Sequence, residues 1–63
     1  MTPILVVLCS FNLATGKPVC SDPMPPADAL SFALSWNAQR PFTASSTHTP
    51  MAVYPADAAP DAR

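Results

Sequence analysis

Apolar residues of this chain fall into four segments separated by proline, and each segment has its own pattern of hydrophobic and polar positions. Proline removes a backbone donor and restricts φ, so regular elements must lie between the nine prolines. The segments are residues 4–13, 19–22, 27–40 and 51–54. The patterns predict two strands, a helix and a third strand, in that order.

The first segment predicts a strand that is central in its sheet. Side chains of a strand alternate between its two faces, and here one face is apolar throughout while the other is apolar only at its start. The two sets are Leu5, Val7, Cys9, Phe11 and Leu13 on one face, and Ile4, Val6, Leu8, Ser10 and Asn12 on the other. Strands that are apolar on both faces are normally covered on both sides.

The same apolar run is a poor match to an export signal or a membrane span. A signal peptide needs a positively charged start and an uninterrupted apolar stretch, but no Lys or Arg precedes Lys17 and the run is broken by Ser10 and Asn12. A lipoprotein box needs a small residue before its cysteine, whereas Leu8 precedes Cys9. No stretch between prolines reaches the about 20 apolar residues of a membrane helix. We therefore expect a cytoplasmic protein.

The first two strands are expected to form a hairpin. The loop around residues 14–17 contains Gly16, the single glycine of the chain, where such a loop favours a left-handed residue. A four-residue loop places Cys9 opposite Cys20, and a three-residue loop sends the two side chains to opposite faces. Without an export signal, reduced thiols are favoured over a disulfide.

Residues 27–40 are expected to form a helix. Pro25 and Pro26 suit its entry, Asp28 suits the positive end of its dipole, and Pro41 ends it. Its apolar positions cover about half of a helical wheel. The predicted core contacts are Leu30, Ala33 and Leu34, and Phe32 and Trp36 lie at the edge of the apolar arc.

Together these elements predict an α+β fold, a small ββαβ domain over residues 1–55. A right-handed crossover places the first strand between the other two, which gives a three-stranded antiparallel sheet of order 2-1-3 with one helix packed on one face. The third strand is flanked by prolines and therefore suits an edge. Residues 56–63, rich in Ala, Asp and Pro, are expected to form a flexible C-terminal tail.

Composition and charge exclude several functions. With 63 residues the chain has room for one domain with a small core. Only 11% of the residues are charged, the net charge is −1, and the three basic residues are far apart, so the chain has no basic surface for nucleic acid. One glycine cannot form a phosphate-binding loop. We expect neither a nucleic-acid nor a membrane partner, and no small-molecule substrate is evident.

Candidate chemistry is equally sparse. Cys9, Cys20 and His48 supply at most three of the about four ligands of a zinc site. A catalytic assembly would have to combine one of these cysteines with His48 and an aspartate, and no spacing brings them together. His48 lies among Ser and Thr residues and is expected on the surface. We therefore predict no catalytic residue, no metal and no cofactor.

The predicted fold leaves one apolar sheet face without a cover. If Val7 faces the helix, then Ile4, Val6 and Leu8 face outward, and an uncovered apolar patch usually marks an interaction surface. The predicted partner-binding residues are Ile4, Val6, Leu8, Phe32 and Trp36. The alternative is that the polar loop and the tail fold back over this face.

Two functions remain open at this point. One is a non-enzymatic protein-binding module that modulates or joins a larger assembly, and the other is a self-associating structural protein. The layout of hairpin, proline-led helix and closing strand is similar in outline to small accessory proteins of bacteria and their phages. This resemblance covers most of the chain but rests on no specific motif and transfers no residues.

Overall fold

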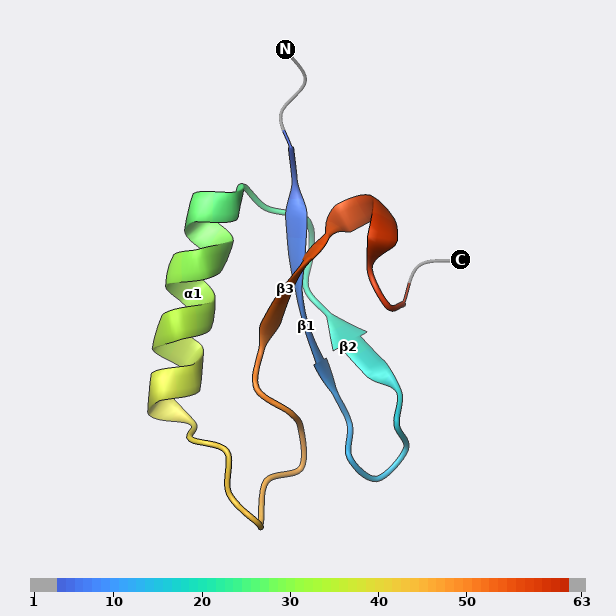
Figure 1. Cartoon of the computed structure of the whole chain (residues 1–63), viewed down its shortest axis with the longest axis vertical. Coiled ribbons are helices and arrows are strands. Elements are labelled where there is room, and N and C mark those ends of the chain that lie inside the picture. Colours follow the sequence, from blue (N-terminus) through green and yellow to red (C-terminus); the bar gives the residue numbers. More distant parts are fainter. Residues whose placement is uncertain (1–3, 62–63) are drawn as a thin grey trace.

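The computed structural model describes residues 4–61, which form a three-stranded sheet with one helix packed against it (Figure 1). The elements are β1 (Val6–Phe11), β2 (Pro18–Cys20), α1 (Pro26–Gln39), β3 (Ala52–Pro55) and a short 3₁₀ helix, η1 (Ala56–Ala58). Both strand pairs are antiparallel and the sheet order is β2-β1-β3. The predicted α+β fold, its strand order and its central first strand are therefore confirmed.

The hairpin adopts the register of a four-residue loop. Phe11 pairs with Pro18, and the Asn12 N–H donates to the Lys17 carbonyl at 2.9 Å. The Asn12 side-chain oxygen accepts hydrogen bonds from the N–H groups of Ala14 and Thr15, as in other Asx turns. Gly16 has φ of +73°, the left-handed conformation expected of it.

This register places Cys9 opposite Cys20, and the two residues form a disulfide. Their Cα atoms are 4.1 Å apart, close enough for a direct bridge across the strands. The expectation of two reduced thiols is therefore wrong for this structure. That expectation was based on compartment, whereas the geometry follows from the loop length.

The helix begins and ends one residue earlier than expected, and its orientation differs from the predicted one. Ala29 and Ala33 are buried against the sheet, whereas Leu30 and Leu34 are 56% and 65% exposed. The prediction of Ala33 as a core contact is confirmed, and that of Leu30 and Leu34 is wrong. Small side chains let the helix backbone approach the sheet closely, and the larger leucines then lie beyond the edge of the contact.

The assignment of the two faces of β1 is also wrong. Val6 and Leu8 pack with Ala29 and Ala33 under the helix, and Val7 and Cys9 lie on the other face. The link from β2 to α1 explains this choice, because Val6 and Met24 exchange two backbone hydrogen bonds of 2.9 and 2.8 Å. Met24 joins the Val6 cluster and brings the helix onto that face.

The second face of the sheet is covered by the C-terminal segment. Ala59 is buried against Val7 and Cys9, with Tyr54 and Ala56 packed beside them. Figure 1 shows α1 on one side of the sheet and η1 with the following residues on the other. The chain thus covers β1 on both faces, as in the fold-back alternative, and part of the segment expected to be a tail makes core contacts.

Candidate functional site

The structure separates the five residues predicted to bind a partner. Val6 and Leu8 are core residues, so we propose no docking role for them. Ile4 is 75% exposed just before β1. Phe32 is half exposed and stacks on the partly buried Trp36, with ring centroids 5.8 Å apart.

Two apolar residues that were predicted to be core form an exposed stripe on α1. Leu30 and Leu34 are four residues apart and therefore share a helix face, and Asn37 continues that face one turn later. The Asn37 side chain bonds to the backbone of Met51, just before β3, so this face lies on the β3 side of the helix. We call Leu30 and Leu34 the leucine stripe.

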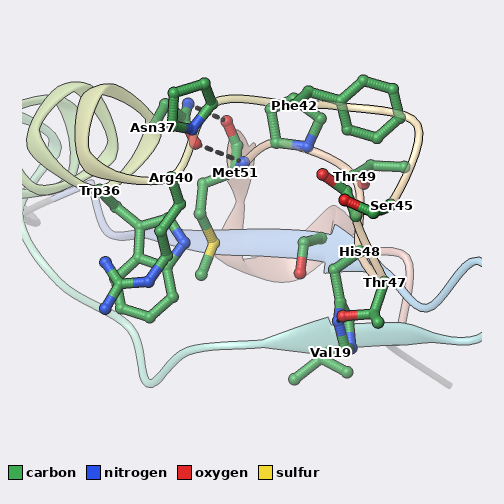
Figure 2. Close-up of a pocket in the computed structure, with 14 residues that line it drawn as sticks. Val19, Trp36, Asn37, Arg40, Phe42, Ser45, Thr47, His48, Thr49 and Met51 are labelled. Carbon is green, nitrogen blue, oxygen red and sulfur yellow. Dashed lines mark hydrogen bonds between the residues drawn. The ribbon is translucent and has the colours of Figure 1, made fainter.

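A pocket of about 490 Å³ lies on the helix side of the sheet (Figure 2). Three parts of the chain line this open pocket: the end of α1, the connection from α1 to β3, and the hairpin. Ser10 and Val19 come from the two paired strands of the hairpin. The lining residues are Ser10, Val19, Trp36, Asn37, Arg40, Pro41, Phe42, Ser45, Ser46, Thr47, His48, Thr49, Pro50 and Met51.

The connection that forms the outer wall of this pocket is held in place by hydrogen bonds. Asn37 donates to the Met51 carbonyl at 3.1 Å and accepts from the Met51 N–H at 2.9 Å. Two residues earlier in the chain, the Thr49 N–H donates to the Phe11 carbonyl, and the Thr49 hydroxyl accepts from the Phe11 N–H. A backbone bridge also joins His48 to Asn12. The second half of the connection, residues 47–51, is therefore bonded both to α1 and to the hairpin. The hydrogen bonds of its first half are local ones among Thr43, Ser45 and Ser46.

The chemical character of the pocket comes from one cation, one imidazole and several hydroxyls. The guanidinium carbon of Arg40 lies 3.7 Å from the centre of the Trp36 ring, a cation–π contact. The Nδ1 atom of His48 is 3.0 Å from the Thr47 hydroxyl oxygen. Figure 2 shows the Arg40–Trp36 pair at one end of the pocket and His48 beside Val19 at the other. No Asp or Glu is among the lining residues.

The candidate catalytic assembly weighed from the sequence does not form. Both thiols are joined in the Cys9–Cys20 disulfide, so neither is available as a nucleophile in this state. His48 bonds to Thr47 and lies beside Val19. Within residues 4–61, no group of three or more His, Cys, Asp or Glu side chains is arranged to hold a metal ion.

Sequence reasoning identified neither the leucine stripe nor the pocket. Leu30 and Leu34 were visible as a pair, but their exposure depends on which side of α1 meets the sheet. The pocket joins Ser10 to residues 36–51, which are distant in the chain. Arg40 beside Trp36 at helical spacing was the one local signal for it.

Comparison with known proteins places the chain in no family. No family model matches, and neither a curated protein nor a solved structure is similar at a significant level. Among residues 4–61, the structure contains no helix that combines the length and the apolar character needed to cross a membrane.

Proposed function

We propose that this protein is a small non-enzymatic binding module that docks on another protein through the leucine stripe. The observation that carries the proposal is the exposure of Leu30 and Leu34, 56% and 65%, on a 14-residue helix that buries Ala29 and Ala33 against the core. Leucines at i and i+4 are typical anchors for helices that lie in an apolar groove of a partner.

The surroundings of the stripe support docking there. Val53, on the edge strand β3, is 44% exposed and pairs with Leu8, so it lies on the helix face of the sheet. Asn37 places the stripe on this same side. The apolar surface thus continues from helix to sheet edge, and apolar patches of this kind are typical of interaction sites.

A second candidate function is self-association through the same surface. β3 is an edge strand, and an edge strand presents unpaired backbone groups to a second copy. The net charge of −1 opposes association only weakly. In this case the stripe of one copy covers the stripe of the other, and no separate partner is required.

The experiment compares a stripe variant with a matched variant on another helix face. Leu30→Lys/Leu34→Lys adds two positive charges to the stripe, and Ser35→Lys/Gln39→Lys adds the same charges at the same spacing on exposed positions away from it. Circular dichroism should show both variants folded. Light scattering after size exclusion then reports the mass of each protein over a range of concentrations.

The outcomes separate the two functions. A dimer that only the stripe variant dissociates supports self-association. A monomeric wild type that captures a defined protein from its native host, with capture lost only in the stripe variant, supports the binding module. A monomer whose captured proteins are the same for all three chains would overturn the role of the stripe in both functions.

The compartment of the working protein is linked to its cysteines. A cytoplasmic location, expected from the sequence, is consistent with reduced thiols, and the Cys9–Cys20 disulfide weighs against it because disulfides persist in oxidising compartments. Rapid alkylation in the native host followed by mass spectrometry distinguishes the two. Two alkylated cysteines would favour the cytoplasm, and an unlabelled chain would favour an oxidising compartment.

A further inference from the structure

The pocket beside α1 is separate from the leucine stripe, since neither Leu30 nor Leu34 lines it. Its volume of about 490 Å³ lies within the range of about 300–1,000 Å³ typical of sites for small organic molecules. Residues 49–51 of its lining are held by the Asn37–Met51 and Thr49–Phe11 bonds. This part of the pocket wall is therefore fixed by contacts within the fold.

The charges around the pocket are uneven. Arg40 lines it, and the four acidic residues of the chain, Asp22, Asp28, Asp57 and Asp61, do not. A chain of net charge −1 thus has a concave surface whose lining carries a cation without a carboxylate. Such a surface attracts anions in preference to cations.

The position of Arg40 suits recognition of a planar anionic group. Its guanidinium carbon lies 3.7 Å from the centre of the Trp36 ring, and a guanidinium that stacks on an aromatic ring can still donate through its in-plane N–H groups. Those donors match the two oxygens of a carboxylate. The hydroxyls of Thr47 and Thr49 and the ring of His48 add polar groups farther along the pocket.

The remaining lining includes apolar surface that suits a hydrocarbon body. Val19 and Met51 contribute aliphatic and thioether surface, and Trp36, whose ring stacks with Phe32 and Arg40, contributes its ring edge. Figure 2 shows the Met51 side chain between the Arg40–Trp36 pair and His48. We infer that the pocket binds a small aromatic carboxylate, with its ring against Met51 and the edge of Trp36 and its carboxylate on Arg40.

The test uses 1-naphthoate as the probe and 1-naphthamide as its neutral match. Trp36 is the single tryptophan of the chain, so its fluorescence reports binding at the pocket directly. We expect saturable binding of the acid and about tenfold weaker binding of the amide, the loss expected for one charge-assisted pair. Affinities, rather than signal amplitudes, are compared.

Two variants assign the charge effect to Arg40. Arg40→Gln removes the cation from the pocket, and Lys17→Gln removes the same charge from the hairpin loop outside it. The first should weaken naphthoate binding about tenfold and leave naphthamide unchanged, whereas the second should alter neither by more than about twofold. Amide shifts in NMR spectra should centre on residues 36–51.

Any of the following results would overturn the inference. One is the absence of saturable naphthoate binding up to its solubility limit. Another is equal affinity for the acid and the amide, or unchanged affinity in the Arg40→Gln variant. The last is a set of NMR shifts centred on the leucine stripe, which would place the probe on the docking surface of the proposed function instead of in the pocket.

Discussion

At the scale of single residues, burial in this protein does not follow side-chain size. Alanines at positions 29 and 33 lie in the core under the helix, and leucines at 30 and 34 are exposed. The large core side chain is Leu8, which is fully buried between the helix and its own sheet. Leu8 and Leu34 thus have opposite environments, which makes them a matched pair for mutation.

Leu8→Ala should destabilise the protein by about 2–5 kcal/mol, because it removes buried methyl groups and leaves a cavity. Leu34→Ala should change the free energy of unfolding by less than about 0.5 kcal/mol, since Leu34 is exposed. Urea denaturation of both variants measures the difference. Equal losses would show that Leu34 is a core residue and that the helix is rotated relative to this structure.

Asn37→Ala should lower the free energy of unfolding by about 1–3 kcal/mol. The variant removes the side chain that bonds to both the carbonyl and the N–H of Met51, and these bonds are partly buried. Gln39→Ala is the control, since the Gln39 amide donates to the hydroxyl of the exposed Ser35. Thermal melts compare the two. Identical melting temperatures would mean that the connection from α1 to β3 is not anchored by Asn37.

At the scale of elements, the hairpin of β1 and β2 is held together by its turn and by a disulfide. Gly16 and Asn12 shape a loop whose length determines which residues face each other. β2 has only three residues and lies at an edge, so few backbone bonds hold it. The Cys9–Cys20 disulfide therefore fixes an element that is weak by itself.

Reduction of this disulfide should lower stability by about 2–3 kcal/mol, the effect expected for a short closed loop. Melting temperatures with and without dithiothreitol measure the change. The Cys9→Ala/Cys20→Ala variant is the control, and reductant should leave its melting temperature unchanged. An oxidised wild type that is indifferent to reductant would show that the link contributes nothing to stability.

At the scale of the whole molecule, a central strand is enclosed between two thin layers. Val6 and Leu8 meet the helix, and Val7 and Cys9 meet the segment after β3. A domain of this size buries little surface, so each layer matters to its stability. Covering both faces leaves the helix exterior, the sheet edges and the pocket as the surfaces available to ligands.

Ala59→Asp tests whether the C-terminal segment is part of this enclosure. A carboxylate against Val7 and Cys9 lacks a partner, and the variant should lose at least about 1–3 kcal/mol of stability. Ala58→Asp places the same group at an exposed neighbouring position and should have little effect. If chemical denaturation gives the same midpoint for both, the segment does not hold the second face of the sheet.

The sequence by itself determined the elements, their order and the central place of β1. These features depend on local information: prolines limit the elements, Gly16 allows the turn, and a strand apolar on both faces must be inside. The bounds of α1 followed from Pro26 and Pro41 in the same way.

Only the tertiary structure decided which face meets which layer, and with it the candidate sites. Alternation divides the side chains of β1 into two sets but does not say which set lies under the helix; the Val6–Met24 bonds decide that. The apolar arc of α1 was wider than its contact, so close packing of Ala29 and Ala33 left the leucine stripe outside. The pocket depends on contacts between residues that are distant in the chain, and such contacts exist only once the chain has folded. The disulfide follows from the hairpin register, which the sequence left open between two loop lengths.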